Sequence, residues 1–263
     1  MKAIITILGL FLVGCGQKEN TAYLQTNVIS VSPPKITTNS SLIDSFVTVK
    51  ASLKLEDASI YYTKDGSMPN EKSTLYTKPL KIEKSGTYSF KAYHPDWKSS
   101  AISMITLHKK GIDVSAGFSV SEPHPKYVGV GNLTLVNQQK ASLNFSDKQW
   151  VGYDTLVKGN INLKEEAFIK SVTIGYLSDM SSWIFPPSKV SVLINNNPSL
   201  KKEIRLNTPD SVSARKMDAL IIPINAKVNT LYLEIENRTS IPNWHEGSGG
   251  KAWLFMDEWI INQ

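Results

Sequence analysis

The sequence predicts an all-β protein made of two β-sandwich domains, and three observations support this. Short runs rich in Val, Ile, Thr and Tyr recur between turn signals, for example at residues 47–55, 59–63, 169–177, 189–194, 219–224 and 230–236. Almost no segment keeps the 3.6-residue period of an amphipathic helix, which argues against alternating βα units. The length of 263 residues allows two domains.

The N-terminus predicts a secretion signal and a lipid anchor. The apolar run 3–13 follows a lysine, and it is long enough for a signal peptide but too short to span a bilayer. Residues 12–15, Leu-Val-Gly-Cys, resemble the lipobox of bacterial lipoproteins, and Cys15 is the only cysteine. We therefore expect a signal peptide over 1–14, then a lipidated Cys15 and a polar tether over 15–32. Gly16 after the cysteine resembles signals for the outer membrane, so we expect a bacterial outer-membrane or cell-surface location.

A first domain is expected over residues 33–108. The strand-like run 59–63 is followed by Asp65-Gly66, a dipeptide typical of hairpin turns. Residues 62–69 resemble the Tyr-Thr-x-Asp-Gly-x-x-Pro signature of the small immunoglobulin-like chitobiase/β-hexosaminidase C-terminal domain. In that family the domain is usually a spacer beside a glycoside hydrolase or a binding module, so we assign no ligand site to it.

A second domain is expected over residues 112–263, after a polar stretch that ends in Gly111. Three aromatic motifs occur in it in order, at residues 149–153, 182–187 and 243–258. Together they resemble the C-terminal domain of many bacterial beta-N-acetylhexosaminidases, which is a discoidin-type, family-32-like carbohydrate-binding module. The resemblance implies a galactose-binding-like jelly-roll β-sandwich that binds sugars in loops at one end.

The last motif suggests where a sugar would bind. A glycine-rich, flexible loop carries Trp, His, Glu and Lys into the strand-like run 252–255. A pyranose packs its C–H face on an aromatic ring while polar groups bind its hydroxyls. We expect the aromatic rings to stack on a sugar, with the histidine and the lysine donating to hydroxyl or N-acetyl oxygens. The expected site residues are Tyr153, Trp183, Trp244, His245 and Lys251, whereas Trp150, Trp253 and Trp259 are expected in the core.

The same resemblance implies a structural calcium, bound by an Asp-Gly turn, a hydroxyl residue and a glutamate near the C-terminus. Ser142 and Glu258 occupy matching places, but Asn137-Gln138 replaces Asp-Gly. The loss of one carboxylate weakens a site for a hard cation, although an asparagine amide oxygen still coordinates. Calcium, if bound at Asn137, Ser142 and Glu258, is expected to be structural, and no cofactor is required.

Catalysis is not expected from this sequence. The His-x-Gly-Gly-Asp-Glu string of the resembling enzymes does not occur, and the two domains leave no room for a hydrolase barrel. Asp257-Glu258 is the only tempting pair, but adjacent residues on a strand point to opposite faces and cannot both flank one glycosidic bond. The formal net charge of +6 is spread along the chain without an Arg-rich stripe, so nucleic acid is not an expected partner.

The sequence thus predicts a non-catalytic, membrane-anchored lipoprotein that binds host or environmental glycans of the N-acetylhexosamine or galactose type. The alternative is a structural or assembly subunit that binds a protein, such as a glycosidase of a glycan-degradation system. A hydrolase fragment is the third and least favoured reading. The resemblance does not separate the first two, because sugar specificity in such modules lies in variable loops.

Overall fold

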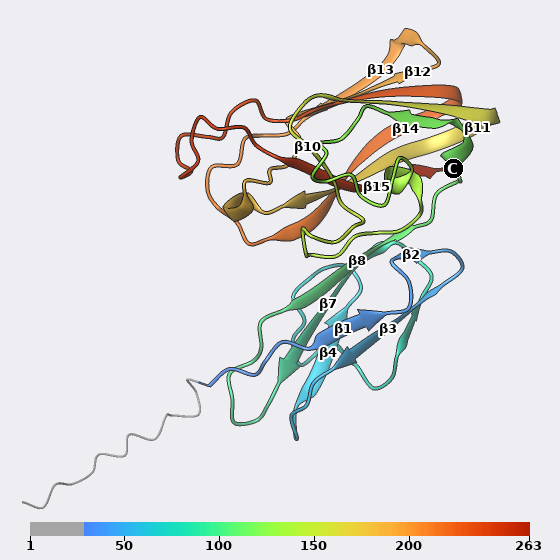
Figure 1. The fold of residues 1–263 in the computed structure, drawn as a ribbon. Coiled ribbons are helices and arrows are strands. Elements are labelled where there is room, and N and C mark those ends of the chain that lie inside the picture. The colour runs from blue at the N-terminus through green and yellow to red at the C-terminus, as the bar shows by residue number, and fades with distance from the viewer. Residues whose placement is uncertain (1–28) are drawn as a thin grey trace, which may run out of the picture.

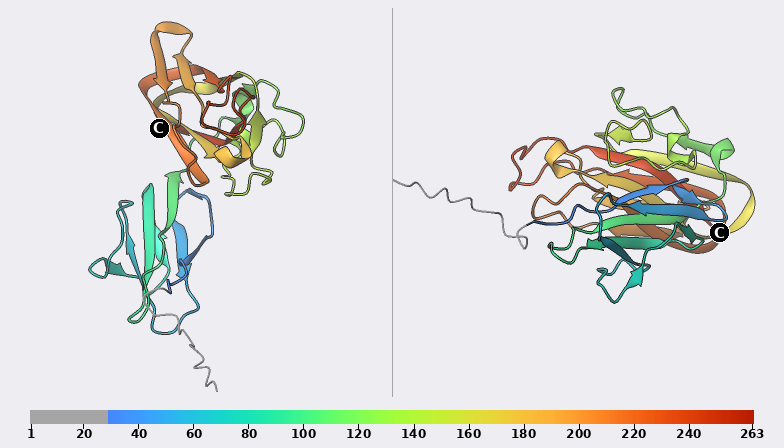
Figure 2. Two further views of the ribbon diagram at one scale, coloured as in Figure 1. Left: turned by 90° about the vertical axis from the view of Figure 1, so that its left-hand side faces the viewer. Right: turned by 90° about the horizontal axis from the view of Figure 1, so that it is seen from below.

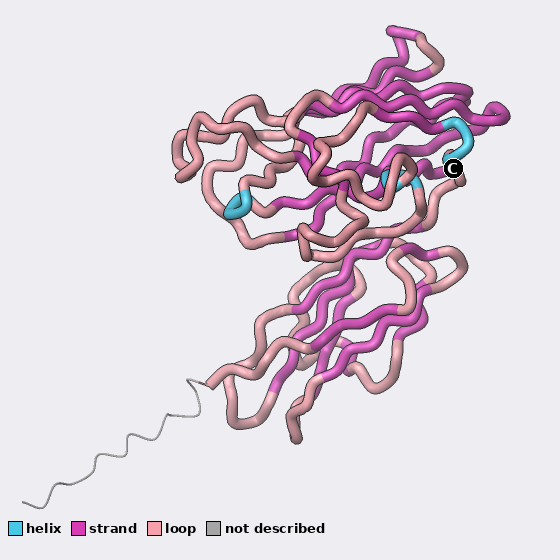
Figure 3. The backbone as a smooth tube through the Cα atoms, in the orientation of Figure 1, coloured by secondary structure: helices cyan, strands magenta, loops and turns pink. Residues whose placement is uncertain are grey.

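The computed structural model describes residues 29–263, and the regular secondary structure of this part of the chain is almost wholly β-strand, joined by long loops (Figure 1, Figure 3). Its helical elements are short 3-10 turns: η2 (Ser115–Gly117), η3 (Thr134–Val136) and η4 (Met180–Ser182). The all-β fold class is therefore confirmed. The expected signal peptide, Cys15 and most of the tether lie outside the described residues. Within residues 29–263, no helix has the length and apolar character needed to cross a membrane.

The first unit is a sandwich of two sheets. One sheet has the order β1 (Lys35–Thr38), β3 (Val47–Ser52), β6 (Leu80–Ile82). The other has the order β2 (Leu42–Ile43), β8 (Ser103–Lys109), β7 (Gly86–Tyr93), β4 (Ser59–Thr63), β5 (Thr74–Leu75). Alternate residues of β3, Val47 and Val49, point inward and pack with Tyr62, Phe90 and Leu107 from the second sheet.

The Asp65-Gly66 turn forms but does not close a tight hairpin. The Asp65 carboxylate accepts hydrogen bonds from the N–H and the hydroxyl of Ser67, at 3.0 and 2.6 Å. Gly66 has a φ of +78°, which glycine adopts without a steric penalty. Strands β4 and β5 do pair antiparallel, but the pairing starts at Tyr62 and Thr74, so residues 64–73 connect them. The dipeptide therefore shapes the start of a longer loop.

The strands of the second unit form one hydrogen-bonded network with the order β10-β15-β11-β14-β12-β13, and β9 pairs with β11. Their bounds are β9 (Phe118–Val120), β10 (Val151–Tyr153), β11 (Val157–Ser178), β12 (Lys189–Ile194), β13 (Asn197–Arg205), β14 (Lys216–Glu236) and β15 (Leu254–Asn262). The sequence-predicted strands 219–224 and 230–236 are one strand, β14, and the predicted strand 169–177 is the second half of β11. The separation into shorter strands was therefore wrong.

Long strands let this network fold into two layers around one core (Figure 2). The first half of β11 pairs with β9, whereas its second half pairs with β15. Between the halves, the β11–β14 register shifts twice, between Asn162 and Ala167 and between Ile169 and Ser171. Such irregularities bend strands. As a result, Val157 and Ile161 of the first half share one core cluster with Val172 and Ile174 of the second.

A bulge in β15 changes the direction of two acidic side chains. Gly175 of β11 faces both Asp257 and Glu258, because the pairs on either side are in register: Ile174 with Trp259 and Tyr176 with Met256. The core-facing residues of β15 are accordingly Leu254, Met256, Trp259 and Ile261. Asp257 and Glu258 therefore both project from the other face. The expectation that they point to opposite faces was wrong, because the extra residue resets the alternation.

The connection between the two units is held on both sides. Lys110 N–H donates to the Ile43 carbonyl at 2.8 Å, and Ile112 N–H donates to the Ile261 carbonyl at 3.0 Å. Between them, Gly111 lies so close to β15 that an added Cβ would be 2.7 Å from the backbone N and O of Ile261. The glycine is thus needed for close backbone approach, and the linker follows the surface of both units.

Candidate functional site

Two partly exposed tryptophans lie on loops of the second unit, and one of these loops, between β14 and β15, extends at the left of Figure 1. Trp183 is 43% exposed and follows η4, whereas Trp244 is 37% exposed and lies in the loop between β14 and β15. Trp183 has a φ of +63°, a left-handed conformation that is uncommon for a large side chain. Two backbone hydrogen bonds, both of 2.8 Å, hold this conformation. The Trp183 N–H donates to the Met180 carbonyl, and the Trp183 carbonyl accepts from the Trp253 N–H.

Gly247 forms the support beneath the Trp183 ring. A Cβ on Gly247 would lie 3.0–3.2 Å from the Cε2, Cζ2 and Nε1 atoms of the indole. The indole therefore rests on bare backbone, and a side chain at position 247 would push it outward by a few tenths of an ångström. This contact joins the turn after β11 to the loop before β15 and fixes the orientation of an exposed aromatic ring.

Trp244 is held by its own indole N–H. It donates to the Pro209 carbonyl at 2.8 Å, so its polar atom is used within the protein. Its ring contacts the buried Phe185 at a centroid distance of 6.4 Å and His245 at 5.5 Å. The exposed part of Trp244 is thus apolar ring surface with a fixed direction, which is the surface that a sugar face or another apolar group contacts.

His245 is a structural brace. It is buried, its Nδ1 accepts the Gly247 N–H at 3.0 Å, and its Nε2 lies 2.9 Å from the Met180 carbonyl. Because Nδ1 is an acceptor, Nε2 carries the proton and donates to Met180. Both ring nitrogens are therefore engaged. The expected role of His245 as a donor to ligand oxygens is corrected: it ties together the two loops that carry the tryptophans.

The glycine-rich loop is more ordered than the sequence suggested. Its ends meet through Ile241 N–H to Gly250 carbonyl at 2.9 Å and Gly249 N–H to Ile241 carbonyl at 3.1 Å. Gly249 has a φ of +80°, which permits this tight closure. The glycines here allow a compact turn that is closed by backbone hydrogen bonds.

A buried arginine supports the neighbouring loop, a role that the sequence analysis did not predict. Arg238 donates to the Thr208 hydroxyl at 2.9 Å and to the Asn207 carbonyl at 2.7 Å. These bonds position the segment that offers the Pro209 carbonyl to Trp244. Arginine has several donors in one rigid plane and can hold several loop acceptors at once.

Tyr153 is not available at this site. It is 1% exposed, belongs to the core cluster, and donates its hydroxyl to the Ser121 carbonyl at 3.3 Å. Burial raises the pKa of its phenol. The expected stacking role is corrected, because a residue of a strand that alternates toward the core cannot also present a ring face to solvent.

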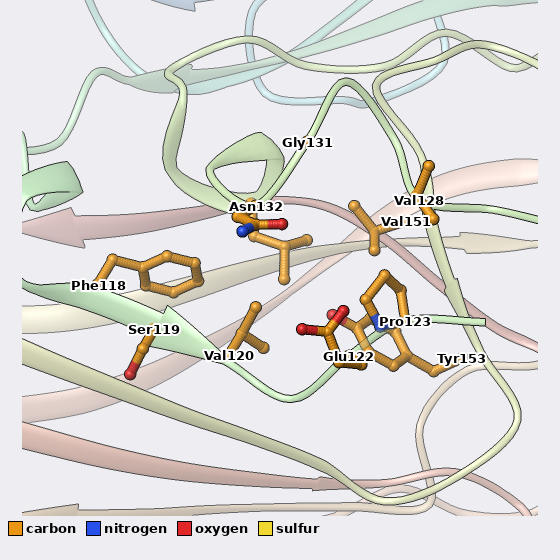
Figure 4. A pocket seen from close by; sticks show the side chains of 11 residues that line it. Phe118, Ser119, Val120, Glu122, Pro123, Val128, Gly131, Asn132, Val151 and Tyr153 are labelled. Carbon is orange, nitrogen blue, oxygen red and sulfur yellow. The ribbon is translucent and has the colours of Figure 1, made fainter. Parts of the chain in front are cut away.

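Tyr153 instead lines a separate cavity of about 180 Å³ (Figure 4). Apolar side chains from β9, η3 and β10 form much of its wall, and the Glu122 carboxylate points toward its centre (Figure 4). Neither Trp183 nor Trp244 lines this cavity, so it is distinct from the surface that carries the tryptophans.

Lys251 is exposed at the end of the loop that carries Trp244. Its side chain is 73% exposed, and its ammonium lies 3.6 Å from the Asp154 carboxylate. An exposed pair at this distance contributes little to stability and breaks at low cost. Of the expected site residues, the structure thus leaves Trp183, Trp244 and Lys251 open to a ligand, assigns His245 to their support and removes Tyr153.

Two of the three expected calcium ligands, Asn137 and Ser142, make hydrogen bonds with residues of their own loop. The Asn137 amide oxygen accepts the Gln139 N–H at 3.0 Å, and its nitrogen donates to Gln149 at 2.7 Å. Ser142 is exposed, and its N–H donates to the Asp147 carboxylate. Within residues 29–263, no three His, Cys, Asp or Glu side chains gather in a way that suits a metal ion.

Asp257 and Glu258 are buried, with exposures of 0% and 2%. Burial, helped by the adjacent charge of Asp257, raises the pKa of Glu258 to about 9. Because this value is above that of the unfolded chain, the contribution of Glu258 to stability is complete at acidic pH and declines as the pH rises toward 9. Neither carboxyl is accessible to a glycosidic bond, so the pair does not form a hydrolase site.

Comparison with known proteins agrees with the sequence resemblance in the first unit. Residues 38–104 match the family model of the chitobiase/beta-hexosaminidase C-terminal domain, which is about a quarter of the chain. No curated protein matches the sequence.

Several solved structures are similar to the chain at low identity. A family 32 carbohydrate-binding module produced by Clostridium perfringens, in complex with glcNAc-alpha-1,4-galactose, has 10% identity and a TM-score of 0.32, covering 56% of this chain and 91% of its own. A Streptococcus pneumoniae fucose binding module has 14% identity and a TM-score of 0.37, covering 58% and 95%. A SusE-like protein has 11% identity and a TM-score of 0.34, covering 87% and 96%. These scores are too low to assign a ligand.

The brace formed by His245 can be tested by replacement with phenylalanine. His245→Phe keeps a ring but leaves the Gly247 N–H without its partner, and it leaves the Met180 carbonyl with the Trp183 N–H alone. We expect the free energy of unfolding to fall by about 1–3 kcal/mol, measured by urea denaturation. Glu246→Ala, at the exposed neighbouring position, is the control and should change it by less than about 0.5 kcal/mol. Equal stability of His245→Phe and the wild type would contradict the brace.

Proposed function

We propose that the protein is a non-catalytic glycan-binding protein, held at a bacterial membrane through Cys15, that binds sugars on Trp183 and Trp244. The observation that carries this proposal is the pair of exposed indoles fixed by a buried brace. Exposed apolar surface that is bordered by polar residues often marks a binding site. The match of residues 38–104 to a domain named for chitobiases and beta-hexosaminidases supports a role in glycan metabolism.

The chemistry of the rim suits a neutral or weakly polar sugar. Each indole offers an apolar face to the axial C–H groups of a pyranose, and both indoles are fixed before the ligand arrives. Lys251 and Glu246 add a donor and an acceptor in the same loop, both exposed. N-acetylhexosamine and galactose-type glycans are the candidates, since both present an apolar patch beside hydroxyl or amide groups.

A protein partner is the second candidate, and one observation favours it. The segment between β9 and β10 exposes several aliphatic side chains: Val128, Val130, Leu133 and Leu143. Exposed apolar groups that gather on loops are typical of surfaces that bind other proteins. A pull-down that recovers one stoichiometric partner and is insensitive to free sugar would favour an assembly subunit.

The glycan site is tested by removing each indole. We expect Trp183→Ala and Trp244→Ala each to weaken binding of N-acetylglucosamine or galactose oligosaccharides by about tenfold, because the stacked ring surface is lost. Calorimetric titration measures the affinity, and circular dichroism confirms that the variants remain folded. Phe168→Ala is the matched control, since Phe168 of β11 is an aromatic residue that is 51% exposed. Failure of the folded wild type to bind any of these sugars, or equal loss in the control, would remove the proposal.

The anchor is tested at Cys15. We expect Cys15→Ser to fold with the wild-type melting temperature but to leave the membrane fraction, because the acyl acceptor is gone. The wild type should resist release by high salt and be released by detergent, since burial of acyl chains is not screened by salt. A Cys15→Ser protein that stays membrane-bound in high salt would show that another segment is the anchor.

A further inference from the structure

A loop 120 residues away in sequence closes over the two buried carboxyls of β15. Gln138 N–H donates to Glu258 at 3.0 Å, and Ala141 N–H donates to Asp257 at 3.1 Å. The bulge in β15 makes this possible, because it turns both side chains toward the same loop. Two adjacent carboxyls wrapped by backbone are the kind of place in which proteins hold a cation.

The cation at this place is a side chain of the protein itself. The Lys140 ammonium lies 2.6 Å from Asp257 Oδ1, and its side chain is only 11% exposed. Asp257 Oδ1 also accepts the Glu258 N–H at 2.8 Å, and its other oxygen accepts Ala141 N–H. The buried carboxylate is therefore paired with one positive charge and two backbone donors, which is what burial of a charge requires.

The strand opposite the bulge leaves space for this ion pair. A Cβ on Gly175 of β11 would lie 2.0 Å from Asp257 Oδ1 and 2.1 Å from Lys140 Nζ. The pair thus rests directly on the Cα of a glycine, and any other residue at position 175 would displace it. The bulge, the glycine and the lysine are features of three separate segments that meet at one point.

We propose that the Lys140 ammonium is the built-in cation of the second unit and occupies the place that a divalent metal ion would otherwise take. Two of the expected calcium ligands support this proposal, because Asn137 and Ser142 make hydrogen bonds within their own loop. The unit, and the tryptophan surface on it, then needs neither calcium nor another divalent cation.

The same residue connects the two units. The backbone N–H of Lys140 donates to the Ser41 hydroxyl of the first unit at 3.1 Å. His108, at the end of β8, is near enough for the charge of Lys140 to lower its pKa in addition to the effect of burial. A single loop residue thus contributes its side chain to one unit and its backbone to the other, at the point where the linker begins.

The proposal is tested by thermal unfolding of the full chain with and without divalent cations. We expect the wild-type melting temperature to change by less than about 1 °C between excess calcium and excess chelator. Lys140→Met leaves Asp257 buried without a counter-charge and should lower the melting temperature by about 10 °C. Lys148→Met, at an exposed lysine in the same segment, is the control and should have almost no effect.

A double variant keeps the test decisive if Lys140→Met folds poorly. Lys140→Met with Asp257→Asn removes both charges and keeps one oxygen, which can accept one of the two backbone donors. The double variant should therefore recover at least half of the lost melting temperature. Three results would overturn the proposal: a wild type that calcium stabilises or a chelator destabilises, a Lys140→Met protein as stable as the wild type, or no recovery in the double variant. A measured mass of the intact protein that is lower by one water would also overturn the proposal. It would indicate an amide bond between Lys140 and Asp257, in which the lysine nitrogen carries no charge.

Discussion

The burial of Asp257 beside Lys140 is the interaction on which the second unit depends. Asp257 lies in β15, which pairs with β10 and β11, supports the loop 137–141 and accepts the linker at Ile261. An unpaired buried carboxylate would cost several kcal/mol, so loop, strand and linker must be in place together. One strand therefore sets the position of most of the parts that matter for function.

The tryptophan surface depends on the same strand. Just before β15, Trp253 exchanges backbone hydrogen bonds with Trp183 and Phe185, at 2.8 and 2.9 Å. The loop that precedes it carries Trp244 and is closed by His245 and Gly247. An exposed aromatic ring on a mobile loop would lose side-chain and loop entropy on binding, whereas here the protein has already restricted both. The small size of the surface is thus compatible with useful, weak affinity for a sugar.

The sequence predicted those features that depend on neighbouring residues, such as the bounds of short strands. The strands 59–63 and 189–194 are predicted to the residue, because alternation and turn signals bound them on both sides. The prediction of two separate strands in place of β14 was wrong. Asn225, with a φ of +50°, resembles a turn residue but forms an irregularity within one continuous strand. The prediction that Tyr153 contacts the ligand was wrong, because alternation along a strand does not show which of its two faces packs in the core. The role of Lys140 could not be predicted from the sequence, because a lysine in a loop is usually solvated. Its partner, Asp257, lies in a bulge 117 residues further along the chain.

The most direct test of the account is a titration of the protein, labelled with ¹⁵N, with oligosaccharides of N-acetylglucosamine and of galactose, observed at the indole N–H resonances. The chain has six tryptophans, so each indole is followed separately. Saturable shifts at Trp183 and Trp244, with the buried Trp150 and Trp259 unchanged, are the predicted result. Shifts confined to Trp97 in the first unit, or no shift with any of these sugars, would contradict it.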